Sequence, residues 1–119
     1  MKEYYQNYID GQWVDGGDGT IDITNPGTGE LLAKHAMADA GDVARAVAAA
    51  KIVHDSRART DLRPVERGRM VQAMGRYILE HLDEVAELLC LEQGKPLWEA
   101  KQEIRGTARY FEYYGGQAD

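Results

Sequence analysis

The stretch that most constrains the fold of this chain runs from residue 88 to residue 116, LLCLEQGKPLWEAKQEIRGTARYFEYYGG. Gly94 stands where a helix commonly ends in the left-handed conformation, and Pro96 is well suited to open the next helix. The apolar residues that follow recur with a helical period over about four to five turns. They are Leu97, Ala100, Ile104, Ala108, Phe111 and Tyr114. A stripe of this length predicts a helix that packs against another apolar surface.

The first 38 residues carry the signals of short strands. The Asp10-Gly11 pair separates two short apolar runs, which predicts a tight hairpin. Residues 20–24 alternate apolar and polar side chains, which is typical of a strand with one buried face, and turn residues at 25–29 end it. A further short strand is predicted from residue 30 to about residue 37. So few strands need a covering layer of helices or more strands.

Helical signals begin at Asp39, which is a good N-cap, and Asp42 adds a negative charge near the positive end of the helix. The apolar residues that follow keep helical spacing, and their many alanines predict a buried helix that approaches a neighbour closely. They are Val43, Ala46, Val47, Ala50 and Val53. Residues 56–63 are polar and irregular, which indicates a connection.

Two more helices are predicted between this connection and Gly94. Pro64 suits the first turn of the earlier one, and the pair Asp83 and Glu84 indicates that a new helix starts near residues 81–83. The apolar face of the first is formed by Met70, Met74, Tyr77, Ile78 and Leu82, and that of the second by Val85, Leu88, Leu89 and Leu91.

Taken together, these signals predict short β-strands or a hairpin at residues 1–38, followed by about four α-helices at residues 39–119. A chain of 119 residues supports one domain at most. The order of strands first and helices after leaves the few strands poorly covered, so we expect a single incomplete domain of an α/β or α+β protein.

Composition narrows the classes of function. The formal charge of −6 argues against a phosphate-binding surface, so no nucleic acid is expected, and the arginines of residues 57–69 are interpreted as a solvated loop and helix start. A single cysteine excludes an intramolecular disulfide and favours a reducing compartment. No apolar run approaches a membrane span, and residues 1–10 lack the apolar core of a secretory signal. We therefore expect a cytoplasmic location and no membrane partner.

Chemistry-bearing residues form no catalytic constellation in the sequence. Cys90 lies between two leucines on an apolar helix side, so we interpret it as a buried, inert thiol and not as a nucleophile. The carboxylates at helical spacing are interpreted as solvated faces, and the glycines at 27 and 29 lack the third member of a dinucleotide-binding loop. The histidines are too scattered to form a zinc site, and they are His35, His54 and His81.

Four stretches in this order resemble the amino-terminal part of the NAD(P)-dependent aldehyde dehydrogenase family. They are Tyr8–Val14 (YIDGQWV); Ile23–Glu30 (ITNPGTGE); the alanine-rich Asp42–Ala50 with Pro64–Arg67 after it; and Leu91–Ala100 (LEQGKPLWEA) leading to Arg109–Gly116 (RYFEYYGG). The Leu-Glu-Gln-Gly-Lys-Pro form is similar to that of members acting on semialdehydes.

The resemblance implies an α/β subunit with a cofactor domain, a catalytic domain and an oligomerisation arm, which oxidises an aldehyde to a carboxylic acid with NAD or NADP. It also implies that the catalytic cysteine, glutamate and asparagine and the cofactor-binding turn lie downstream of this segment. No catalytic or cofactor residue is carried over, and Cys90 does not match the motif of the family's nucleophile.

One minor site is carried over from the resemblance. Some members bind a monovalent cation through backbone carbonyls beside the Asn-Pro turn and through an acidic residue before the Gly-Lys pair. The matching positions are Ile23, Thr24 and Glu92, where the family often has the shorter Asp. Oxygen donors suit a hard cation, and an empty turn is the alternative.

The leading hypothesis is an amino-terminal segment of an aldehyde dehydrogenase, inactive alone, whose partner is the remainder of the subunit. A stand-alone helical module that self-associates or binds a partner through its apolar faces is the alternative.

Overall fold

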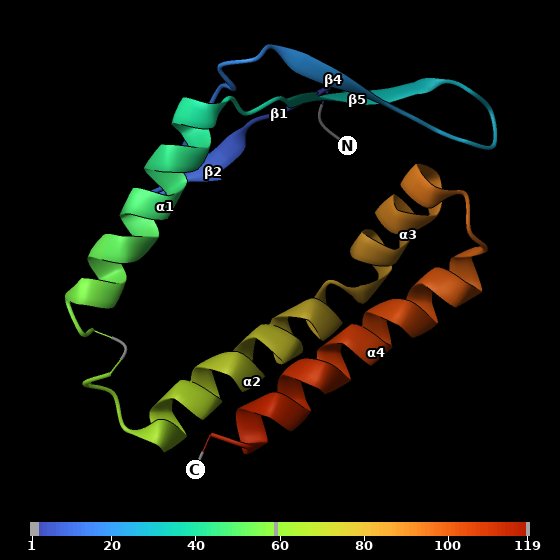
Figure 1. Cartoon of the computed structure of the whole chain (residues 1–119). Helices are drawn as coiled ribbons and strands as arrows, with labels where there is room; N and C mark the ends of the chain where they lie inside the picture. Colours follow the sequence, from blue (N-terminus) through green and yellow to red (C-terminus); the bar gives the residue numbers. More distant parts are fainter. Residues whose placement is uncertain (1–2, 59, 119) are drawn as a thin grey trace. The chain divides into compact units, whose positions relative to one another are not determined.

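The computed structural model describes residues 3–58 and 60–118 of the chain. The chain divides into two compact units, residues 1–58 and residues 59–119. The first unit contains all the strands and one helix, and the second contains three helices (Figure 1). This order of short strands and four helices is the one that the sequence predicts.

The first unit contains a three-stranded sheet in the order β1-β5-β4. Strand β5 (Leu31–Ala36) is central, with β4 (Thr20–Thr24) antiparallel on one side and the short β1 (Tyr4–Tyr5) parallel on the other. The predicted strands at residues 20–24 and from about residue 30 are confirmed, whereas β1 lies ahead of every predicted strand. Ala33 and Ala36 of β5 are buried.

The predicted hairpin is formed by β2 (Asn7–Ile9) and β3 (Gln12–Val14), which pair antiparallel. Asp10 and Gly11 both have positive φ, 52° and 77°, as a type I′ turn requires. The rings of Tyr8 and Trp13 lie opposite each other with their centroids 4.9 Å apart. Turn chemistry and a cross-strand aromatic pair therefore fix the register of this hairpin.

Helix α1 (Ala40–Asp55) begins with a capping box. The backbone N–H of Asp42 donates to the Asp39 carboxylate (2.8 Å), and the N–H of Asp39 donates back to the Asp42 carboxylate (3.0 Å). The N-cap prediction is confirmed, but the prediction of a buried apolar face is wrong for the chain as described. Val43 is 56% exposed and Val47 is 62% exposed, because no described element covers them.

The second unit is built from α2 (Pro64–Glu80), α3 (Leu82–Gln93) and α4 (Leu97–Gly116). Pro64 is the first residue of α2, as predicted, and α3 starts directly after the break at His81. Gly94 ends α3 in the left-handed conformation with φ of 70°, and its N–H donates to the Cys90 carbonyl at 2.9 Å. Local signals thus indicated the start of α2, the break between α2 and α3, and the end of α3.

The core of the second unit lies between α3 and α4. Ala86, Ala100 and Ile104 are buried there, and Ile104 is the largest of them. Partly buried side chains pack around this cluster, and they are Ile78, Leu82, Leu89 and Cys90.

Helices α2 and α4 run antiparallel (Figure 1). They approach most closely at two glycines of α2. A Cβ on Gly68 would lie 2.3 Å from the Gly115 carbonyl oxygen, and a Cβ on Gly75 would lie 2.9 Å from the Ala108 carbonyl oxygen. No larger residue fits either position without moving backbone atoms. The two helices are therefore packed main chain against main chain.

This packing corrects the predicted apolar faces. On α2 the buried residues are Gly68 and Gly75. Of the predicted face, Ile78 packs partly buried against the core, whereas Met70, Met74 and Tyr77 are exposed. On α4 the stripe is buried at Ala100, Ile104 and Ala108 only, while Leu97 and Tyr114 are exposed and Gly115 is buried. On α3 Ala86 is buried, while Val85 and Leu88 are exposed.

The prediction of one incomplete domain stays a prediction. Its internal boundary, residue 38, coincides with the change from strands to helices, whereas the compact units divide after residue 58.

Candidate functional site

A buried carboxylate in the described part of the first unit belongs to Asp42, whose side chain is only 2% exposed. Besides the N–H of Asp39, it accepts a bond from the backbone N–H of Gly17 (2.8 Å) and pairs with the guanidinium of Arg45. These donors, the Gly17 N–H foremost, lower the pKa of Asp42. The carboxylate is therefore held ionised at neutral pH.

Two glycines let the loop after β3 reach this carboxylate. A Cβ on Gly16 would lie 2.0 Å from the Met37 carbonyl oxygen, and a Cβ on Gly17 would lie 2.1 Å from the Asp39 carboxylate. The loop and the start of α1 are thus joined at close range. We call Gly16, Gly17, Asp39, Asp42 and Arg45 the Asp42 cluster.

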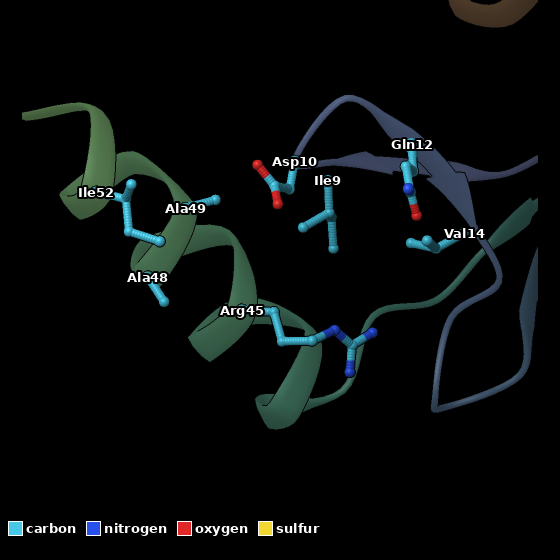
Figure 2. Close-up of a pocket in the computed structure, with 8 residues that line it drawn as sticks. All are labelled: Ile9, Asp10, Gln12, Val14, Arg45, Ala48, Ala49 and Ile52. Carbon is cyan, nitrogen blue, oxygen red and sulfur yellow. The ribbon is translucent and has the colours of Figure 1, made fainter. Parts of the chain in front are cut away.

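A groove of about 320 Å³ lies between the β2–β3 hairpin and α1, within the first unit (Figure 2). Figure 2 shows the hairpin side chains and the α1 side chains on opposite walls of the space. We call it the hairpin groove, and its lining residues are Ile9, Asp10, Gln12, Val14, Arg45, Ala48, Ala49 and Ile52.

The lining of the hairpin groove is mainly apolar. Its positive group, Arg45, already pairs with the buried Asp42, and its negative group, Asp10, belongs to the exposed hairpin turn. A neutral, apolar occupant suits such a lining better than a charged one, because neither charge needs a new partner.

A second hollow, of about 240 Å³, lies between α2 and α4 in the second unit. It is lined by Gln72, Gly75, Arg76, Leu79, Ala108 and Glu112. The lining of this hollow mixes charged and apolar side chains around the Gly75 contact.

The residues of the predicted cation site lie in different units. Ile23 and Thr24 end β4 at an irregularity of the β4–β5 register, and Glu92 is an exposed residue in the last turn of α3. The backbone N–H of Asn25 donates to the Glu30 carbonyl (2.9 Å), which closes the Asn-Pro turn. The cation site stays a prediction.

The structure does not bring the other chemistry-bearing side chains together. Cys90 is half buried against the α3–α4 core. His35 Nδ1 lies 2.8 Å from the carbonyl of Ala36, and His81 Nδ1 lies 3.4 Å from the Glu84 carboxylate. Among residues 3–58 and 60–118 no group of three histidine, cysteine or acidic side chains could hold a metal ion. In the same residues no helix is long and apolar enough to cross a membrane.

Sequence reasoning missed the central feature of the Asp42 cluster. It assigned Asp42 a role at the helix start, but not the bond to Gly17, which is 25 residues away in the sequence. The signal in the sequence was the adjacent Gly16-Gly17 pair.

The short strands and four helices place the chain in the mixed α/β class. Comparison with known proteins identifies the family, because the model of the aldehyde dehydrogenase family matches residues 13–119. The chain belongs to the aldehyde dehydrogenase family. The resemblance drawn from the sequence is confirmed.

Three similar proteins show the extent of the match. Succinate-semialdehyde dehydrogenase [NADP(+)] of Saccharomyces cerevisiae is 37% identical over 93% of this chain and 22% of its own length. Glutarate-semialdehyde dehydrogenase of Pseudomonas aeruginosa is 39% identical over 95% of this chain and 23% of its own length. The crystal structure of an NAD-dependent aldehyde dehydrogenase from Sinorhizobium meliloti superposes with a TM-score of 0.91 at 36% identity, over 98% of this chain and 24% of that one.

The chain therefore spans between a fifth and a quarter of the length of the relatives it matches, and it corresponds to their amino-terminal part.

Proposed function

We propose that this chain supplies the amino-terminal scaffold of an NAD- or NADP-dependent aldehyde dehydrogenase and has no activity alone. The observation that carries the proposal is the match over nearly the whole chain to less than a quarter of each relative. The chain's partner would be the remainder of an aldehyde dehydrogenase subunit.

The roles of this chain and of the remainder of the subunit follow from the chemistry of the reaction. A thiolate that attacks the aldehyde, a base that hydrolyses the thioester and donors for the oxyanion are needed for this chemistry. Those groups, and the site for NAD or NADP, would be supplied by the remainder of the subunit. The Asp42 cluster and the α2–α4 contact would supply rigid support, and cytoplasm is the proposed location.

A semialdehyde is the proposed class of substrate. The two similar proteins that carry substrate names act, by those names, on succinate semialdehyde and glutarate semialdehyde. The sequence of residues 91–96, LEQGKP, is of the form similar to members acting on semialdehydes. The proposed monovalent cation site of Ile23, Thr24 and Glu92 would add to stability and not to the chemistry.

Self-association of the isolated chain is a second candidate property. The exposed apolar residues of α1 favour it, since bare apolar faces tend to associate. Light scattering on the purified chain tests it, and a clean monomer over a wide range of concentrations would contradict it.

The test of the main proposal is a chimera. The matched amino-terminal part of the Pseudomonas aeruginosa glutarate-semialdehyde dehydrogenase is replaced by this chain, and NADH or NADPH formation from glutarate semialdehyde is measured. We expect turnover by the chimera and none by the 119-residue chain alone. An insoluble or inactive chimera, or turnover by the chain alone, would contradict the proposal.

A further inference from the structure

Three aspartates of the first unit are followed directly by glycine, and the pairs are Asp10-Gly11, Asp15-Gly16 and Asp18-Gly19. An Asp-Gly pair is prone to one intramolecular reaction, because glycine has no side chain to shield its backbone nitrogen. The nitrogen attacks the carboxyl carbon of the preceding aspartate, which must be in its acid form so that its hydroxyl can leave as water. The fold decides which of the three pairs can reach the geometry of this attack.

The backbone of the Asp10-Gly11 pair is already close to that geometry. Of the three aspartates only Asp10 has positive φ, 52°. The two favoured hairpin turns, types I′ and II′, share positive φ at this position and differ in the orientation of the central peptide unit. Rotation of that unit interconverts them, and glycine at the second position tolerates both forms. In the II′ form the nitrogen of Gly11 faces the Asp10 side chain, as closure of a five-membered ring requires.

The central peptide unit of the hairpin turn is also free to rotate. The bonds that close a two-residue turn join the flanking residues, which here are the paired Ile9 and Gln12. The side chain of Asp10 is exposed, and a Cβ on Gly11 would come no closer than 3.9 Å to its nearest neighbour, the Tyr8 hydroxyl. The reacting groups can therefore meet without breaking the β2–β3 ladder.

The Asp15-Gly16 pair is held in an unreactive state. The Asp15 carboxylate accepts bonds from the side-chain amide of Gln6 (3.0 Å) and from the hydroxyl of Tyr4 (2.9 Å). These bonds lower the pKa of Asp15, so that its carboxyl is less often in the acid form. A Cβ on Gly16 would lie 2.0 Å from the Met37 carbonyl oxygen, so the backbone is packed closely on this side.

The Asp18-Gly19 pair is bonded to the main chain at both of its ends. The N–H of Asp18 donates to the carbonyl of Met37 (3.0 Å), and the carbonyl of Gly19 accepts from the N–H of Met37 (2.9 Å). Rotation of the peptide unit between them would strain both bonds, which slows the reaction at this pair.

We propose that Asp10 is a site of spontaneous covalent modification, at which it closes a succinimide ring with Gly11 and reopens as isoaspartate. In the first step the Gly11 nitrogen forms a bond to Cγ of Asp10, and the nitrogen's proton leaves with the Cγ hydroxyl as water. In the second step water adds to one of the two ring carbonyls and breaks its bond to the nitrogen. Addition at Cγ restores aspartate, whereas addition at the main-chain carbonyl carbon leaves the chain running through Cβ and Cγ. Water is the only reactant needed.

The modification would disrupt the β2–β3 hairpin. Isoaspartate adds one atom to the main chain of a turn whose two-residue length sets the register of the strands. The rings of Tyr8 and Trp13 would then no longer lie opposite each other.

Incubation of the full chain in heavy-oxygen water tests the proposal, because each ring opening leaves one heavy oxygen atom in the product. The buffer is held at about pH 5, near the ordinary pKa of an aspartate, so that the acid form is present. All three pairs lie in one tryptic peptide, residues 3–34, and its fragmentation in the mass spectrometer compares them directly. We expect heavy oxygen to enter Asp10 at least about tenfold faster than Asp15 or Asp18, with isoaspartate forming at position 10.

Two controls separate the effect of the fold from that of the sequence. In concentrated urea the three pairs should react at similar rates, because the bonds that hold Asp15 and Asp18 are lost. Asp10→Glu cannot close a five-membered ring and should take up no heavy oxygen at position 10. Equal rates at the three pairs in the native chain overturn the proposal, as does the same preference for Asp10 in urea. Uptake at position 10 in the Asp10→Glu variant also overturns it, because the label would then enter by direct exchange.

Discussion

Helices α1 and α4 carry similar apolar patterns, but of the two only α4 has buried apolar side chains within the described residues. Ile104 of α4 is 8% exposed, since α2 and α3 cover that face. Val47 of α1 is 62% exposed. The difference shows that an apolar stripe predicts that a helix packs against another surface, but does not predict which part of a protein supplies that surface.

The largest effect on stability is expected from a pair of side-chain truncations, one in each of the two helices. Ile104→Ala should destabilise the chain by about 2–5 kcal/mol, because it removes buried methyl groups and leaves a cavity. Val47→Ala should change stability by no more than about 0.5 kcal/mol, because its side chain is exposed. Urea unfolding followed by circular dichroism measures both.

Measured in the chimera, the substitutions Ile104→Ala and Val47→Ala give a stricter comparison of the two helices. There Val47→Ala should be more destabilising than in the isolated chain, if α1 is enclosed by the remainder of the subunit. An equal, small effect of Val47→Ala in both proteins would mean that α1 is a surface helix.

The next effect concerns the close approach of α2 and α4. Gly68→Ala should destabilise by about 1–3 kcal/mol, because its Cβ meets the backbone carbonyl of Gly115. Gly106→Ala is the matched control, since a Cβ there meets nothing within 4 Å, and it should stabilise by up to about 1 kcal/mol. Thermal unfolding of both variants gives the comparison. Equal thermal midpoints for Gly68→Ala and Gly106→Ala would contradict the main-chain contact between α2 and α4.

A smaller effect is expected from the Asp42 cluster. Asp42→Ala leaves the N–H groups of Gly17 and Asp39 without their carboxylate acceptor, so the thermal midpoint should fall by a few degrees. Asp55→Ala is the control, because Asp55 lies on the same helix with an exposed pair to Lys51. If the thermal midpoint of Asp42→Ala is as high as that of Asp55→Ala, the Asp42 cluster contributes nothing to stability.

The smallest effect is the dependence of this contribution on pH. Hydrogen bonds from Gly17 and Asp39 lower the pKa of Asp42 in the folded chain, so the stabilisation is fully present above about pH 4, the range of an unfolded aspartate. It is lost as the pH falls through the folded pKa. The stability difference between the native chain and Asp42→Asn should therefore shrink on acidification. A difference that is constant between pH 7 and pH 2 would remove the electrostatic explanation.

Much of the fold was predictable because its signals are local. The Asp10-Gly11 turn, the Asp39 N-cap, Pro64 at the start of α2 and Gly94 at the end of α3 all act through their own backbone conformation. Residue type alone indicates such positions.

The buried faces were less predictable because glycine carries no hydrophobic signal. Gly68 and Gly75 form the contact surface of α2, while the apolar Met70 and Met74 point elsewhere. The bond from Gly17 to Asp42 joins residues far apart in the sequence and follows only from the folded arrangement. For the cation site, sequence similarity supplied the residues Ile23, Thr24 and Glu92, and its geometry is untested.

The two glycine contacts between α2 and α4 also limit how this segment can vary. Gly68 and Gly75 are separated by the same number of residues as Ala108 and Gly115, so both contacts depend on one register of two helices. Inserting or deleting a single residue inside either interval would rotate one contact by about 100° relative to the other, so the two contacts could no longer form together. Changes in length should therefore be tolerated less within these two intervals than in surface connections between elements.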